Sequence, residues 1–142
     1  MANALYGLGR NAFLLGDIDW VADTIKVTLI DAADYAVSID VHQYMNTDTV
    51  PAAAKVATAT LSGKSAALGV ADATDAVFST VSGDQSEALI IWKDGGGGGT
   101  SASGTTDLLI AYIDTATGLP ITPNGGDITV VWDNGANKIF KL

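Results

Sequence analysis

Few residues in this chain could do nucleophilic or acid–base chemistry, and none of them forms a catalytic motif. His42 is the sole histidine, and there are no cysteines. The lack of cysteine excludes thiolate catalysis, cysteine-ligated zinc and disulfide bridges. A Ser-His-Asp arrangement could include His42, but no Gly-X-Ser-X-Gly elbow is present. We therefore predict no enzyme, no catalytic residue and no cofactor; an enzyme would need a pocket where His42 meets a carboxylate and a hydroxyl.

Pairs of closely spaced aspartates are the residues best suited to hold a metal ion. Carboxylate oxygens are ligands that calcium prefers in proteins. The pairs are Asp17 and Asp19, Asp31 and Asp34, and Asp72 and Asp75. None of them matches the EF-hand loop with its terminal glutamate. Because aspartate also caps turns, we interpret these pairs as turn residues and predict no metal site.

A run of glycines, Gly95 to Gly99, opens the Gly/Ser/Thr-rich segment 95–106. Glycine-rich loops cradle phosphate in nucleotide-binding proteins, but such loops need a lysine followed by Ser or Thr at a helix start. Segment 95–106 contains no basic residue and leads into an apolar run. Its composition is typical of a linker, so we predict a flexible loop without a ligand.

Three tryptophans could serve either a hydrophobic core or an aromatic platform for a sugar. Trp92 lies in an apolar run, which favours a place in the core. Trp20 or Tyr44 is the candidate for an exposed platform. A carbohydrate-binding β-sandwich therefore stays open as an alternative function.

The charge balance argues against one class of partner. The chain has 7 basic and 16 acidic residues, which gives a formal net charge of -9. A negative surface repels phosphate backbones, so we expect no direct contact with nucleic acid. Every acidic residue except Glu87 is aspartate, and aspartate favours turns over helix interiors. The composition thus points to many turns and few long helices.

The pattern of apolar runs predicts an all-β fold. Residues 25–29 alternate apolar and polar, which is typical of a strand with one solvated face. Residues 87–94 and 108–113 are apolar on both faces and should be central strands. Shorter strands are expected at 55–61, 65–70 and 76–81. We predict one domain, 1–142, with a jelly-roll-like β-sandwich of about eight strands; a small β-barrel is the alternative.

The two ends of the chain carry further signals. Leu5, Leu8, Ala12 and Leu15 form a helical stripe, weakened by glycines, so residues 1–16 should form a short helix or an arm. No apolar run is long enough to span a bilayer, and we expect no membrane contact.

Near the other end, Asn134-Gly135 predicts a type I′ hairpin in which Val130 lies opposite Ile139. Its second strand would leave Phe140 and Leu142 for a subunit contact.

The sequence also resembles a family of small tailed-phage virion structural proteins. The segments that carry the resemblance are 1–7, 13–20, 25–27, 54–57 and 61–64, and most strongly 87–94, 113–120 and 124–142. The resemblance implies a head decoration, or cement, protein bound outside the lattice of the major capsid protein, often as a homotrimer. It also implies assembly in the host cytoplasm and a final place on the outer surface of the virion. A tail or baseplate protein, or a carbohydrate-binding protein at the virion surface, are the alternatives.

Under this resemblance, two sets of residues become candidate contacts. The glycines and leucines near the N-terminus suit an arm that orders when it binds a shell. The candidate capsid contacts are Ala2, Asn3, Leu5, Tyr6, Leu8 and Arg10. The candidate subunit contacts are Phe140 and Leu142. The Gly95 to Gly99 run should point away from the shell, since ordering it would cost entropy.

Overall fold

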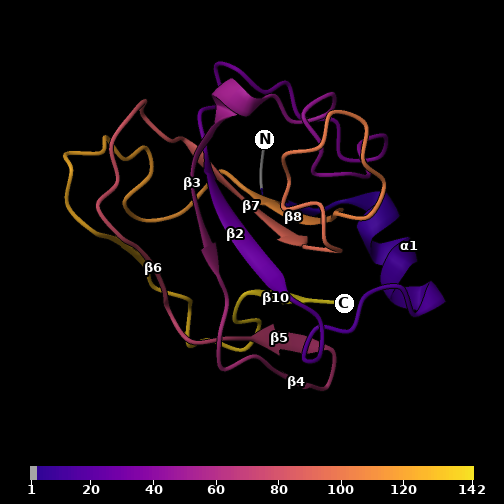
Figure 1. Ribbon diagram of the computed structural model, residues 1–142. Coiled ribbons are helices and arrows are strands. Elements are labelled where there is room, and N and C mark those ends of the chain that lie inside the picture. Colours follow the sequence, from indigo (N-terminus) through magenta and orange to yellow (C-terminus); the bar gives the residue numbers. More distant parts are fainter. Residues whose placement is uncertain (1–2) are drawn as a thin grey trace.

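The computed structural model describes residues 3–142 and consists of ten strands and one α-helix (Figure 1). The strands lie in three antiparallel sheets, with strand orders β1-β8-β7-β2-β3, β10-β5-β4 and β6-β9. The elements are β1 (Ala4–Leu5), α1 (Gly7–Leu15), β2 (Ile25–Ile30), a 3₁₀ turn (Ala52–Ala54), β3 (Lys55–Thr60), β4 (Ser65–Ala67), β5 (Val70–Asp72), β6 (Ala76–Phe78), β7 (Ala88–Lys93), β8 (Leu108–Ile113), β9 (Ile128–Val130) and β10 (Phe140–Lys141). The all-β prediction is confirmed.

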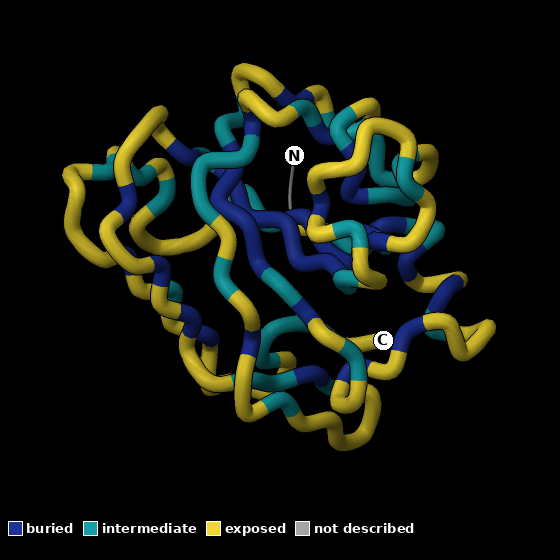
Figure 2. The backbone as a smooth tube through the Cα atoms, viewed as in Figure 1, coloured by how far each residue is buried: buried dark blue, intermediate teal, exposed yellow. Residues whose placement is uncertain are grey.

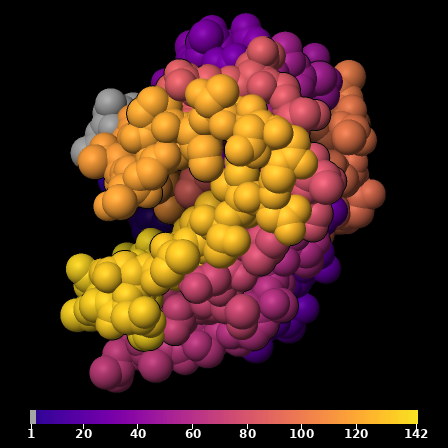
Figure 3. Space-filling view, turned by 90° about the vertical axis from the view of Figure 1, so that its left-hand side faces the viewer, coloured from indigo at the N-terminus to yellow at the C-terminus, as the bar shows by residue number. Residues whose placement is uncertain are grey.

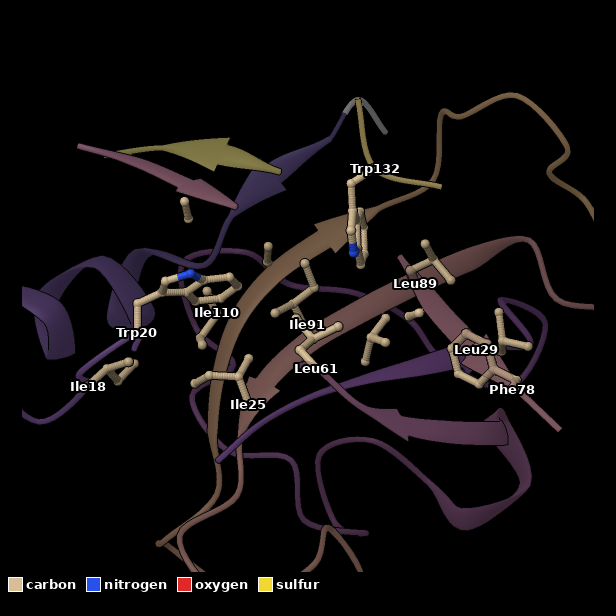
Figure 4. Close-up of a cluster of buried hydrophobic side chains, with 14 of the residues drawn as sticks. Ile18, Trp20, Ile25, Leu29, Leu61, Phe78, Leu89, Ile91, Ile110 and Trp132 are labelled. Carbon is tan, nitrogen blue, oxygen red and sulfur yellow. The ribbon is translucent and has the colours of Figure 1, made fainter. Parts of the chain in front are cut away.

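The five-stranded sheet forms the middle of the molecule, and Figure 2 shows buried, dark blue strands there. The sheet separates two hydrophobic cores. One face packs against the two small sheets, and we call this the first core. Its members include Ile25, Val27, Leu29, Phe78, Leu89, Ile91, Ile110 and Trp132. Figure 4 shows Trp20 and Phe78 at opposite ends of this cluster, with Ile91 between them. The arrangement is therefore sandwich-like.

The other face of the same sheet is covered by the long segment 31–54, and we call this the second core. Its members include Tyr6, Ile30, Tyr35, Met45, Ile90, Trp92 and Tyr112. The prediction that β7 and β8 are central strands is confirmed, because both are buried on both faces. The expected solvated face of β2 is wrong, since only Lys26 in that strand is not fully buried. Thr28 is tolerated there because its Oγ1 hydrogen-bonds Thr58 Oγ1 at 2.8 Å.

From Asn3 onward, where the described residues begin, the N-terminal segment is part of the fold and not a free arm. Strand β1 pairs with β8, and the Tyr6 backbone N–H donates to Ile110 O at 2.9 Å. The predicted short helix forms from Gly7 to Leu15 and packs across β8. Gly9 allows this packing, because a side chain there would collide with the carbonyl oxygen of Leu109. The helix prediction is confirmed, whereas an arm that orders only on binding is wrong.

The predicted C-terminal hairpin does not form. Strand β9 pairs with β6, and β10 pairs with β5 in a different sheet. A type I′ turn needs positive φ at Asn134 and Gly135, but Lys138 is the residue of this segment that has one, at 45°. Trp132 explains the difference, because its backbone N–H donates to Asp75 Oδ1 at 2.9 Å and its indole N–H to Thr74 O at 3.2 Å. These tertiary bonds outweigh the local turn preference.

Candidate functional site

His42 belongs to a hydrogen-bond chain that leads into the second core. Its Nδ1 accepts hydrogen bonds from the Tyr35 hydroxyl at 2.8 Å and from the Ser38 backbone N–H at 3.3 Å. Because a backbone N–H can only donate, Nδ1 is an acceptor, so Tyr35 donates to His42 and the buried Tyr6 hydroxyl donates to Tyr35 at 2.9 Å. The chain holds segment 35–42 against the sheet.

Burial shifts the pKa values of this chain in the directions that favour neutral groups. Burial lowers the pKa of His42 below its usual value. It also raises the pKa of Tyr35 to about 12, and the pKa of Tyr6 is raised further, by burial and by the neighbouring Tyr35. The hydrogen-bonded side chains of Tyr6, Tyr35 and His42 are thus uncharged near neutral pH and serve a structural role.

The glycine-rich segment 95–106 is folded around a carboxylate from the same loop. Asp107 is buried, and its Oδ1 accepts from the backbone N–H groups of Gly95 at 2.9 Å and Gly97 at 3.1 Å. Its Oδ2 accepts from Gly99 at 2.7 Å. The amide groups that could cradle a phosphate are therefore already occupied. The prediction of a flexible linker is wrong, because an anchor just after the segment organises it.

Two lysines support this loop. Lys55 Nζ donates to the carbonyl oxygens of Gly99 and Met45. Burial lowers the pKa of Lys55, and the charge of Asp107 opposes that change. Lys26 pairs with Asp94 at 2.6 Å, and this bond holds the pKa of the Asp94 carboxyl low, at about 2. The loop is thus tied to strands β2 and β3 by its charged neighbours.

Within residues 3–142, no group of three or more His, Cys, Asp or Glu side chains is arranged to hold a metal ion. The paired aspartates act on their own turns instead. Asp19 Oδ1 accepts from the backbone N–H of Val21 at 3.0 Å, and Asp31 Oδ1 accepts from Ala33 at 2.8 Å. These bonds agree with the interpretation of the pairs as turn residues.

The tryptophans are buried, with Trp92 fully covered and Trp20 and Trp132 only 6% and 7% exposed. The core position predicted for Trp92 is confirmed. Trp20 packs edge-on against Phe140 at a centroid distance of 5.1 Å. A sugar platform at Trp20 is therefore wrong, and Tyr44 is only half-buried.

Four exposed side chains of α1, two of them leucines, form a surface that we call the helix face. It consists of Arg10, Asn11, Leu14 and Leu15. Leu14 is 87% exposed and Leu15 is 68% exposed. Arg10 and Leu14 are four residues apart and so lie on the same side of the helix. An exposed leucine pair on a helix packed rigidly to the sheet is a candidate contact for another protein.

A second exposed apolar surface lies where the β4–β5 hairpin meets β10, and we call it the tip. It consists of Leu68, Gly69, Lys141 and Leu142, and the Leu142 backbone N–H donates to Gly69 O at 2.9 Å. Leu68 is 95% exposed and Leu142 is 56% exposed. The predicted strand 65–70 is wrong at this point, because the chain reverses at Leu68 and Gly69. Their φ angles of 52° and 78° are those of a type I′ turn.

A groove of about 860 Å³, lined by both apolar and polar residues, opens beside the first core. Its walls include Leu89, Ile113, Ile128, Trp132 and the loop 115–119. Val131 and Asp133 also line it, and Val131 is 70% exposed. Figure 3 shows the hollow between the orange loop that follows β8 and the yellow C-terminal segment.

The residues predicted as capsid contacts have different positions in the structure. Ala2 lies outside the described residues. Asn3 and Arg10 are exposed, while Leu5 and Leu8 are half-buried. Tyr6 is fully buried and bonded to Tyr35, so it is unavailable to a capsid in this conformation. Asn3 is also engaged, since its Oδ1 accepts from the backbone of Asp114 and Thr115 at 3.0 and 2.9 Å.

The predicted subunit contacts lie at or beside the tip. Leu142 is exposed there, whereas Phe140 is half-buried and packs on Trp20 and Phe13. Sequence reasoning missed Leu14, Leu15, Leu68 and Val131 as exposed residues. Gly69 was the available sequence signal for the turn at Leu68. The exposure of Leu14, Leu15 and Val131 depends on tertiary packing, which the sequence does not show locally.

No protein family model matches this chain, and no curated protein matches it either. None of the helices in the described part of the chain is long and apolar enough to cross a membrane.

Proposed function

We propose that this chain is a non-enzymatic decoration, or cement, protein of a tailed-phage head. It binds the outside of the major capsid protein lattice as a homotrimer and stabilises the mature shell. Two observations support the proposal. The sequence carries the segments that resemble such proteins, and Leu14 and Leu15 are exposed on a helix that also carries Arg10.

The helix face is the observation on which the proposed capsid contact depends. Leu14 and Leu15 are exposed although the neighbouring Ala12 is buried in the first core. Helix α1 follows β1, which pairs with β8, and the helix itself packs on β8, so binding would order little backbone. Arg10 adds a cation to this surface of an otherwise acidic protein. We therefore move the proposed capsid contact from the segment around Tyr6 to Arg10, Leu14 and Leu15.

Cementing requires many modest contacts and not one strong site. Each copy would bury a few apolar side chains, and the linked contacts of an oligomer on a repeating lattice would convert weak binding into long retention. A protein that binds only the mature lattice stabilises that lattice by mass action. A cement protein needs a stable fold more than reactive groups. The hydrogen bonds of His42 and Asp107 fit this role, because they stabilise loops of the same chain.

The proposal is tested by binding to purified heads that lack this protein. The variant with Leu14→Asp and Leu15→Asp removes the apolar character of the helix face without touching a buried residue. Val41→Asp is the matched control, because Val41 is 71% exposed and lies outside the helix face. We expect wild type and the control to cosediment with heads and to raise their thermal stability, while the double variant loses at least about tenfold in occupancy.

Two results would contradict the proposal. Failure of the wild-type protein to bind heads would remove the decoration function. Normal occupancy by a folded double variant would remove the helix face as the contact. Antibody labelling of intact particles separates a head position from the tail or baseplate alternative.

A further inference from the structure

The leucine at the tip has no explanation within the fold of one copy. A type I′ turn favours Asn-Gly, because both central residues need positive φ. Leu68 occupies the first of these positions with φ 52°, a conformation that residues with a Cβ rarely adopt. Its side chain is 95% exposed and therefore gains almost nothing from burial. Strain together with exposure at one residue indicates a role outside the isolated chain.

The tip also carries a cation that is free to bind an acidic partner. The chain has seven basic residues. Five of them are used within residues 3–142: Lys26, Lys93 and Lys138 form ion pairs, and Lys55 and Lys64 bond to carbonyl oxygens. Lys141 is exposed beside Leu142, and no ion pair or hydrogen bond of its ammonium is found in the same residues. The tip thus combines two exposed leucines with the ammonium group of Lys141.

The groove differs from the tip in its available charge. Its lining combines apolar side chains such as Leu89, Ile113 and Trp132 with polar ones, and Val131 is exposed there. Its one lysine, Lys138, is neutralised by Asp72 at 2.9 Å. Asp133 lines the groove and is exposed. A volume of about 860 Å³ is large enough to take several side chains, since pockets of roughly 300–1,000 Å³ hold whole small ligands.

We infer that two copies of this chain associate head to tail, with the tip of one copy seated in the groove of the next. Leu68 and Leu142 would contact the apolar part of the groove, formed by residues such as Ile113 and Trp132, and Lys141 would face Asp133. The β4–β5 hairpin projects from the body of the molecule in both Figure 1 and Figure 3, which suits it for insertion.

The proposed contact joins two different surfaces, so its geometry differs from that of a twofold dimer. Such a contact leaves one free tip and one free groove on every pair of copies, so further copies can bind at both ends. A closed ring forms when the rotation between neighbouring copies brings the last tip into the first groove. The inference rests on the proposed function only for the number of copies in the ring, which is three in the proposed homotrimer. The contact itself is tested in solution without capsids.

The test uses two variants that keep the fold. Leu68→Asn produces the Asn-Gly pair that a type I′ turn prefers, so the variant should be at least as stable as wild type. Val131→Arg places a charge at an exposed groove position. We expect wild type to form a closed oligomer in sedimentation velocity, and each variant to show at least about a tenfold higher dissociation constant. Val41→Asp, outside both surfaces, should associate like wild type.

Mixing the variants tests the head-to-tail geometry. The Leu68→Asn copy keeps a groove and the Val131→Arg copy keeps a tip, so an equimolar mixture should form a heterodimer that neither variant forms alone. Lys141→Asp and Asp133→Lys should each weaken association, and the two changes combined in every copy should restore it.

Each of the following results in solution would overturn the inference: a wild-type chain that is monomeric at all accessible concentrations, unchanged association in either single variant, or a mixture that stays monomeric. If Val131→Arg lowers binding to heads but not association in solution, the groove belongs to the capsid protein. That outcome would overturn the inference while leaving the proposed function intact. Association in solution without any binding to heads would do the reverse.

Discussion

The buried carboxylate of Asp107 should be a main determinant of this protein's stability, and Asp107→Ala tests that expectation. The side chain accepts three backbone N–H groups, from Gly95, Gly97 and Gly99. Gly95 is exposed and Gly97 is half-buried, so water can replace much of what they lose. Gly99 is buried, and an unsatisfied buried donor costs about 1–3 kcal/mol.

The expected loss follows from these three bonds. Leaving the buried N–H of Gly99 without an acceptor costs about 2 kcal/mol. Replacing the bonds of Gly95 and Gly97 with bonds to water adds about 1 kcal/mol together. Asp107→Ala should therefore lower the free energy of unfolding by about 3 kcal/mol. Asp107→Asn should cost less, about 2 kcal/mol, because its amide oxygen can still serve Gly95 and Gly97 while its amide nitrogen faces the Gly99 donor.

Urea unfolding followed by tryptophan fluorescence measures these losses. Amide hydrogen exchange at Gly99 provides a local readout, since protection there depends on the Asp107 bond. Asp84→Asn is the matched control, because Asp84 is exposed and should change stability by less than about 0.5 kcal/mol. A loss below about 0.5 kcal/mol for Asp107→Ala, or unchanged protection of Gly99, would refute the idea that this carboxylate organises the loop.

Three further outcomes are expected. Because burial lowers the pKa of His42, stability should be full above pH 6.5 and fall as the pH drops from there through the folded-state pKa; urea midpoints from pH 8 to 5 should show this in wild type but not in His42→Asn. Trp92→Phe removes the bond from the indole N–H to Thr28 Oγ1 (2.9 Å) and should lower the unfolding free energy by about 2 kcal/mol, whereas a neutral result would show that the bond is replaceable. Gly9→Ala should lower the melting temperature despite the higher helix propensity of alanine, because the new Cβ would collide with Leu109 O; a raised melting temperature would contradict the close packing of α1.

The sequence predicted those elements whose cause is local. Strands β7 and β8 were identified because an apolar run buried on both faces needs no knowledge of its partners. The spacing of Leu5, Leu8, Ala12 and Leu15 indicated the helix, and α1 follows most of that stripe. Trp92 was placed in the core for the same reason. In each case the information lies within a few residues of the element.

The predictions that failed depend on contacts between distant residues. The order in segment 95–106 comes from Asp107, whose carboxylate is indistinguishable in sequence from that of any other turn aspartate. The turn expected at Asn134-Gly135 was displaced because Trp132 is bonded to Asp75, far away in the chain. The turn at Leu68 was missed because leucine is a poor residue for that conformation.

The same limits apply to the candidate site. Arg10 and Leu142 were named from the sequence and are exposed, whereas Tyr6 was named and is buried. A tyrosine at the entry to a helix gives no local sign that it will donate to Tyr35 under a long loop. Surfaces such as the groove are formed by several elements at once, and no single segment encodes them.

The position of the five-stranded sheet between two cores has a consequence for how the sequence can change over time. Along β2, Val27 points into the first core, whereas Thr28 points toward the second core and bonds to Trp92. Adjacent positions of the strand therefore contact different sets of neighbours. Substitutions on opposite faces should combine additively, while those on one face should constrain each other. The small sheets that carry the tip and the groove could therefore diverge and acquire new binding partners while the opposite half, with segment 31–54, is inherited unaltered.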